Sequence, residues 1–106
     1  MACKIIIPDE FTRDFEKLVF KLDKCTRAKL TRELDLLEKK GPVLPMPYVK
    51  KIQKDIWELR IRGKQEVRVL YTAKNNEVYL LNLFVKKSQK TPLSEINKSL
   101  KRLHKI

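Results

Sequence analysis

The sequence predicts a single α+β domain in which a short strand and two helices precede three antiparallel strands and a last helix, with the helices over one face of the sheet. The length of 106 residues gives room for one hydrophobic core and hence one domain, residues 1–106. Apolar residues recur at helical spacing near both ends of the chain, whereas between residues 57 and 85 they alternate with charged residues or form a continuous run. This change of period separates the helices from the sheet.

The N-terminal part is expected to fold as a strand followed by a helical hairpin. Residues 3–7 form a short β-branched run, and Pro8 with the acidic residues after it is typical of a helix start. The apolar stripe of the first helix consists of Phe11, Phe15, Leu18, Val19 and Leu22. A second helix should run from about Thr26 to Lys39 and stop at Gly41. The residues it is expected to bury are Leu30, Leu34 and Leu37.

The middle of the chain is expected to form the sheet. Residues 41–47 hold three of the five prolines and therefore predict an ordered connection or lid. In the strand after it, apolar and charged residues alternate, which predicts a half-buried strand with a charged outer row. The apolar set is Trp57, Leu59 and Ile61, and the charged set is Glu58, Arg60 and Arg62. Residues 67–73 predict the next strand, residues 74–77 a polar turn, and residues 78–85 a central strand covered on both faces.

A last helix is expected after this strand. Thr91 is the predicted N-cap, and Pro92 is the predicted first-turn residue. One face is apolar and consists of Leu93, Ile96, Leu100 and Leu103. The charged residues on or near the other face are Lys98, Lys101, Arg102 and Lys105. We interpret them as a solvated face, with contact to ribosomal RNA as the alternative.

The charge balance favours a polyanionic partner. Lys and Arg number 25 and Asp and Glu 13, which gives a net charge of +12. The first 50 residues carry 11 basic and 8 acidic residues, and the rest of the chain carries 14 and 5. The partner surface is therefore expected in the second half, and nucleic acid is the leading partner class.

Several classes of protein are excluded or disfavoured by what the sequence lacks. Two glycines cannot form a glycine-rich phosphate loop, so nucleotide cofactors are not expected. Cys3, Cys25 and the single His104 have no metal-ligand spacing, so no metal site is expected and both thiols should be reduced. The apolar run at residues 5–7 is too short for a membrane span or a signal peptide. We expect a cytoplasmic protein that needs neither cofactor nor membrane.

Three sequence blocks resemble those of the HigB branch of the RelE/ParE toxin superfamily, which includes phage-derived toxins. The blocks are WELR at residues 57–60, RVLY at residues 68–71 and FVKKSQKTP at residues 84–92. The segment LPMPY at residues 44–48 is also similar to that branch, so the resemblance covers about residues 42–104. It implies a RelE-like β-α-α-β-β-β-α fold with a small, mainly antiparallel sheet.

The same resemblance implies a function and a set of partners. It implies the toxin of a type II toxin–antitoxin system that cleaves mRNA on the translating ribosome as a metal-independent endoribonuclease. The implied partners are the ribosome, mRNA and a HigA-like helix-turn-helix antitoxin, with operator DNA contacted only through the antitoxin.

The residues themselves suggest where such chemistry could lie. Strand parity lets cations from three strands converge on the sheet surface away from the helices, and such a cluster suits a phosphodiester. Our hypothesis is that Arg60 and Arg68 bind the scissile phosphate, that Lys87 or Lys86 acts in proton transfer, and that Glu58 is a possible base. The expected additional RNA contacts are Arg62, Lys64, Lys90, Lys50 and Lys51.

Each assignment has a structural alternative. Glu58 could simply pair with Arg60 or Arg68 across the strands, and Tyr71 and Trp57 are expected in the core rather than in the site. Two other functions also remain open. One is a ParE-like inhibitor of DNA gyrase, and the other is a non-catalytic basic RNA-binding module, although such modules usually expose aromatic residues on the sheet.

Overall fold

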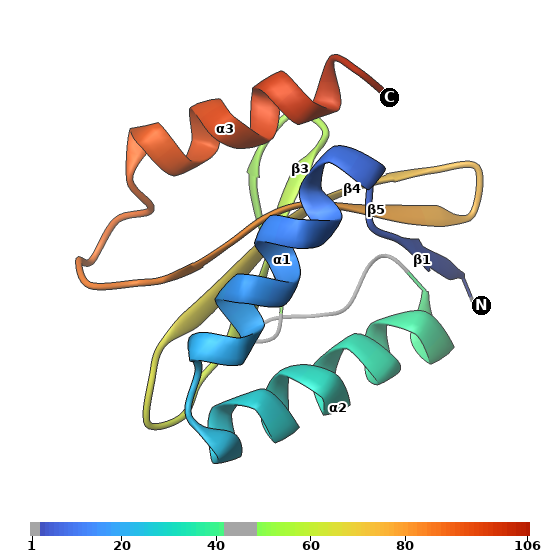
Figure 1. Ribbon diagram of the computed structural model, residues 1–106. Coiled ribbons are helices and arrows are strands. Elements are labelled where there is room, and N and C mark those ends of the chain that lie inside the picture. The colour runs from blue at the N-terminus through green and yellow to red at the C-terminus, as the bar shows by residue number, and fades with distance from the viewer. Residues whose placement is uncertain (1–2, 42–48) are drawn as a thin grey trace.

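The computed structural model describes residues 3–41 and 49–106, and it contains one five-stranded sheet with three helices (Figure 1). The elements in chain order are β1 (Lys4–Ile6), α1 (Asp9–Lys21), α2 (Lys24–Lys40), β2 (Val49–Gln53), β3 (Ile56–Ile61), β4 (Val67–Lys74), β5 (Glu77–Val85) and α3 (Leu93–Leu103). The α+β class is confirmed. Except for Gly41, the connection or lid expected at residues 41–47 lies outside the described residues.

The strands lie in the order β1-β5-β4-β3-β2. β1 is parallel to β5, and the other neighbours are antiparallel. The hairpin between β4 and β5 turns through Asn75 and Asn76, whose φ angles of 51° and 65° suit the tight turn predicted there. β5 lies inside the sheet, as expected for the long apolar run.

The edge strand β2 was not expected from the sequence. It pairs with β3 and contains a bulge between Lys51 and Gln53. Its sequence, VKKIQ, has only two apolar residues and is largely exposed, so it lacks the alternation by which a half-buried strand is recognised. Exposed lysines on such an edge discourage pairing with another chain.

The helices cover both faces of the sheet, which corrects the expectation that they share one (Figure 1). α1 and α2 pack on a large apolar cluster that includes Leu59 and Val69, while α3 packs on a second cluster. The second cluster consists of Ile56, Leu70, Leu81 and Phe84, with Ile52, Ile96, Leu100 and Leu103 packed against it. Alternate residues of β3 and β4 thus contribute to different faces, and the second face is apolar enough to hold a helix.

The start of α3 also differs from the expectation. Pro92, not Thr91, is the N-cap residue, and the Thr91 hydroxyl is used elsewhere. Leu93 is 70% exposed rather than part of the packed face. α3 is anchored instead by Asn82, whose amide donates to the Glu95 carbonyl and carboxylate at 3.1 and 2.8 Å. This polar residue in the apolar run of β5 therefore fixes the helix on the sheet.

The expected core positions of Tyr71 and Trp57 are confirmed. Tyr71 is fully buried and stacks on the half-buried Trp57, with ring centres 6.2 Å apart. Burial also raises the pKa of the Tyr71 phenol. Cys3 is buried, Cys25 is exposed, and both are free thiols. Within the described residues, no helix has the length and apolar character needed to cross a membrane.

Candidate functional site

A hollow of about 340 Å³ lies where β2, β3 and the segment after β5 meet the first turn of α3. Its lining contains five cationic side chains and a single carboxylate, together with polar and apolar residues. The lining residues are Lys50, Lys51, Ile52, Glu58, Arg60, Lys86, Gln89, Lys90, Thr91 and Ile96. We call this hollow the basic hollow.

Strand parity places the charged residues on the α3 side of the sheet. Along β3, Trp57, Leu59 and Ile61 join the α1–α2 cluster, so Glu58 and Arg60 point the opposite way. Arg68 on β4 lies directly opposite Arg60. The predicted charged row is therefore real, but it lies partly under α3 and is not a solvated outer row: Glu58 and Arg68 are buried.

Glu58 is the centre of this charged cluster. Its Oε1 lies 3.3 Å from Arg60 Nε and 3.7 Å from Arg68 Nε, and its Oε2 accepts a hydrogen bond of 2.5 Å from the Thr91 hydroxyl. Glu58 thus pairs with both arginines considered for it, along β3 with Arg60 and across the strands with Arg68. Because both carboxylate oxygens are engaged, Glu58 is suited to holding the arginines in place.

Arg68 is buried and is held by neighbouring oxygen atoms rather than presented to solvent. One guanidinium nitrogen donates to the Val67 carbonyl at 3.0 Å, and another lies 3.2 Å from Glu66 Oε1. Only 4% of its side chain is exposed, compared with 14% for Arg60. Arg60 can therefore contact a ligand in the basic hollow. Arg68 is buried and pairs with Glu58 instead.

The pKa of Lys86, which lines the basic hollow, is lowered. Desolvation lowers its pKa from 10.5, the positive charges of Arg68, Arg60 and Lys50 lower it further, and the carboxylate of Glu58 opposes the shift. Its backbone N–H donates to the Glu66 carbonyl, which fixes the chain where β5 ends. A lysine in this setting loses its proton more readily than a solvated one.

The structure brings together most, but not all, of the expected site residues. Lys50 and Lys90 line the basic hollow beside Arg60 and Lys86. Lys51 also borders it, although its ammonium lies 5.4 Å from the centre of the Trp57 ring.

Three of the expected residues lie elsewhere. Lys87 is exposed and does not belong to the lining of the basic hollow. Arg62 is 57% exposed and lies 4.0 Å from Glu66. Lys64 lies close enough to Asp23 at the start of α2 to lower the pKa of that carboxyl, in addition to the larger effect of the Thr26 backbone hydrogen bond.

Sequence reasoning missed five contributors to the site, one of which is Gln89 in the lining of the basic hollow. Thr91 was assigned to capping, and Glu66 was not assigned any role. Ile52 and Ile96 add an apolar wall from β2 and α3. The position of Glu66, two residues before Arg68, is a signal that could have identified one of the partners of that arginine.

The metal-ligating side chains are not clustered in the part of the chain that the structure describes. No group of three His, Cys, Asp or Glu side chains there could hold a metal ion.

Comparison with known families gives a match over most of the chain. The family described as "Phage derived protein Gp49-like (DUF891)" matches residues 17–104. This range contains α2, all of the antiparallel strands and α3. No protein of curated function matches the sequence.

Solved structures with a similar fold include components of toxin–antitoxin systems. A chain of the heterotetrameric YoeB-YefM toxin–antitoxin complex from Staphylococcus aureus has a TM-score of 0.53 and 17% identity, covering 76% of this chain and 92% of that one. A copper-bound mutant toxin from Helicobacter pylori has a TM-score of 0.52 and 24% identity, with coverages of 79% and 94%. A conserved hypothetical protein from Helicobacter pylori has a TM-score of 0.51 and 23% identity, with coverages of 90% and 99%. These similarities establish a shared fold.

Proposed function

The chain belongs to the Gp49-like family of phage-derived proteins, and from its fold and basic hollow we propose that it is the toxin of a type II toxin–antitoxin system. Its activity in this proposal is metal-independent, ribosome-dependent cleavage of mRNA, which stops translation and growth. The observation that carries the proposal is the basic hollow, where five cations surround one engaged carboxylate.

RNA is the substrate because the basic hollow suits a phosphodiester backbone. Lys50, Arg60 and Lys90 approach it from β2, β3 and the segment before α3, respectively, so they can contact successive phosphates. The net charge of +12 adds a long-range attraction for the ribosome and its mRNA.

The reaction is attack by the ribose 2′-hydroxyl on the neighbouring phosphorus. The hydroxyl loses its proton to a base, the new oxygen–phosphorus bond forms as the bond to the 5′-oxygen breaks, and the leaving oxygen takes a proton from water. The products are a 2′,3′-cyclic phosphate and a 5′-hydroxyl end. Negative charge builds up on the phosphorane, where fixed cations stabilise it most.

The residues divide these tasks. Arg60 neutralises the scissile phosphate, and Lys86, whose pKa is lowered, is the base for the 2′-hydroxyl. Glu58 and Arg68 are positioning residues, because their charged groups are buried and hold Arg60 in place. The proposal therefore takes Lys86 rather than Lys87 from the two alternatives of the sequence.

The partners follow from the same proposal. The toxin acts on the ribosome with mRNA and is neutralised by a helix-turn-helix antitoxin of the HigA type, through which it is brought to operator DNA. A similar fold occurs in a chain of the YoeB-YefM toxin–antitoxin complex, which supports an antitoxin partner. The sequence blocks at residues 57–60, 68–71 and 84–92 resemble those of the HigB branch, which supports an antitoxin of the HigA type.

Pulse labelling after brief expression tests the proposal. Incorporation of labelled amino acids should fall before incorporation of labelled thymidine. Lys86→Ala should lose this effect, and the matched control Lys4→Ala should keep it, because Lys4 is an exposed lysine on β1 at the opposite edge of the sheet. An earlier fall in thymidine incorporation with gyrase-dependent DNA damage would support a gyrase inhibitor. Ribosome binding with intact mRNA would support a non-catalytic RNA-binding module.

A further inference from the structure

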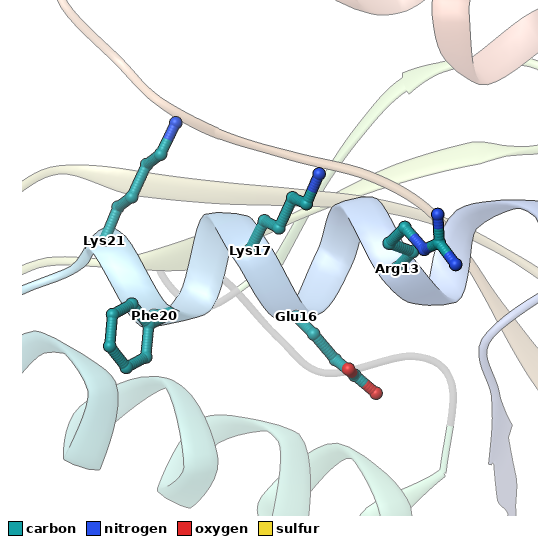
Figure 2. A pocket seen from close by; sticks show the side chains of 5 residues that line it. All are labelled: Arg13, Glu16, Lys17, Phe20 and Lys21. Atoms are coloured by element: carbon teal, nitrogen blue, oxygen red, sulfur yellow. The ribbon is translucent and has the colours of Figure 1, made fainter.

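The outer side of the α1–α2 hairpin carries an exposed aromatic residue with hollows beside it. Phe20 on α1 is 77% exposed, more than any other large hydrophobic side chain among the described residues. A hollow of about 490 Å³, larger than the basic hollow, adjoins it (Figure 2). Its lining is Arg13, Glu16, Lys17, Phe20 and Lys21. We call these five residues the Phe20 patch.

A second hollow on the α2 side of the patch is more apolar. It measures about 230 Å³ and is lined by Phe15, Val19 and Phe20 with Glu16 and Arg27. The Arg27 guanidinium lies 6.0 Å from the centre of the Phe20 ring. An apolar side chain of a partner could therefore enter beside Phe20 and be enclosed by Phe15 and Val19.

The cationic side chains around Phe20 lie on two sides of its ring. Figure 2 shows Lys17 and Lys21 extending from one side of α1, while Phe20 and Glu16 extend from the other side, toward α2. Arg27 provides a cation on the α2 side of the ring. An apolar centre between cationic borders matches an amphipathic helix whose apolar stripe is flanked by Asp or Glu.

The Phe20 patch is separated from the basic hollow by the sheet. α1 and α2 pack on the Leu59 side of β3, whereas the basic hollow opens on the α3 side with Glu58 and Arg60. A helix bound at Phe20 would therefore leave Arg60 and Lys86 uncovered. A partner at this patch acts by its bulk or by its attachment to other molecules rather than by filling the hollow.

We infer that the Phe20 patch is the docking surface for an acidic, amphipathic helix of the antitoxin, which binds while the basic hollow stays open to RNA. This inference rests on the proposed function, because it takes the partner to be an antitoxin. An exposed phenylalanine is the kind of anchor that carries a large share of the binding energy when a partner buries it.

A protein helix fits the Phe20 patch better than RNA does. Glu16 lines both hollows, so a phosphate backbone lying across them would meet its carboxylate. A helix can place its carboxylates at Lys17, Lys21 and Arg27 and leave Glu16 facing solvent. Phe15 and Val19 beside Phe20 add an apolar surface that accepts an aliphatic side chain.

The test uses the product of the reading frame adjacent to the gene as the probe, with calorimetry to measure its Kd for the wild-type chain and for Phe20→Glu. The variant should raise Kd by about 30-fold or more, the effect of losing an interface anchor. Leu93→Glu is the matched control, since Leu93 is 70% exposed on α3, and it should leave Kd unchanged. Phe20→Ser serves as a milder variant, and thermal melting confirms that each protein is folded.

A second arm asks whether the basic hollow stays open. A 12-nucleotide single-stranded RNA with 2′-O-methyl riboses, which cannot be cleaved, is titrated into the free chain and into the complex. Equal affinities are expected for the two, and Phe20→Glu should bind this RNA as the wild type does.

The outcomes separate the docking surface from the proposed function. If the wild type does not bind the adjacent product, the antitoxin part of the proposed function is overturned together with this inference. If the wild type binds but folded Phe20→Glu and Phe20→Ser bind equally well, only the docking surface is overturned. Loss of RNA affinity in Phe20→Glu would make the patch an RNA surface, and competition between RNA and the partner would place the partner over the basic hollow; either result contradicts the inference.

Discussion

The two faces of the sheet are built for different purposes. Among the described residues, the cluster between the sheet and the α1–α2 hairpin has fifteen buried members, whereas the cluster on the α3 side has only four. The second face also carries the charged residues Glu58, Arg60 and Arg68. Adjacent residues of β3 thus serve different faces, so a substitution of one residue can separate stability from the proposed chemistry.

The charged residues on the α3 side of the sheet also contribute to the stability of the fold. Glu58 is buried between two arginines and a threonine, and a buried charge without a partner is costly. The difference between the faces is therefore one of degree: the apolar face contributes to folding alone, and the charged face contributes to folding through Glu58 and to RNA chemistry through Arg60 and Lys86.

The largest expected effect comes from Glu58→Ala. It leaves Arg68 buried beside the remaining partner Glu66, and breaking such a pair costs about 3–5 kcal/mol of unfolding free energy. Urea denaturation measures the change. The control is Glu66→Ala, whose carboxylate is 40% exposed and should cost less than about 1 kcal/mol. Equal stability of the two variants would mean that the Glu58 cluster is not a structural element.

Leu59→Ala tests the opposite face of the same strand. Leu59 is fully buried in the α1–α2 cluster, so the truncation should cost about 2–5 kcal/mol. Cleavage per folded molecule should stay near the wild-type value, since the basic hollow lies across the sheet. A stable Leu59→Ala protein with a large loss of cleavage would contradict the separation of the two faces.

Arg60→Ala should have its main effect on rate. Arg60 lines the basic hollow with 14% of its side chain exposed, and removal of one electrostatic stabiliser typically lowers the rate by about 10²–10³. Single-turnover cleavage of ribosome-bound mRNA measures this, and Arg62→Ala provides a matched control because Arg62 lies outside the hollow lining. Wild-type cleavage by folded Arg60→Ala would remove Arg60 from the site.

The smallest expected effect is the change of the cleavage rate with pH. Because desolvation and nearby cations lower the pKa of Lys86, its neutral form is more abundant at pH 8–9 than that of a solvated lysine. If Lys86 is the base, the cleavage rate should rise with pH and level off below pH 10.5. Lys86→Arg stays protonated and should be slow at every pH. A wild-type rate independent of pH from 7 to 9, with chemistry shown to be limiting, would exclude Lys86 as the base.

The sequence could predict most elements of the fold, because their periods are strong. The stripe from Phe11 to Leu22 and the apolar run from Val78 to Val85 appear in the structure as α1 and β5. A stripe indicates which residues of a helix are buried, but not which face of the sheet receives them. The sequence therefore could not place α3, and it could not reveal β2, whose alternation is interrupted by a bulge.

The candidate site shows the same limit. Strand parity was enough to group Glu58, Arg60 and Arg68, since it follows from alternation alone. Parity cannot show that Arg68 is buried, because burial depends on the packing of α3 and on the contact with Glu66. The hydrogen bond from Thr91 to Glu58 joins residues 33 positions apart and depends on the path of the chain after β5.

The central claim is tested most directly by primer extension on mRNA incubated with the purified protein, with and without translating ribosomes. The account predicts new 5′ ends within translated codons for the wild type, none without ribosomes, and none at the same time point for Arg60→Ala or Lys86→Ala. Lys4→Ala should cut as the wild type does. Intact mRNA with translating ribosomes, or equal cleavage by folded Arg60→Ala and Lys86→Ala, would contradict the assignment of the basic hollow as the site of RNA cleavage.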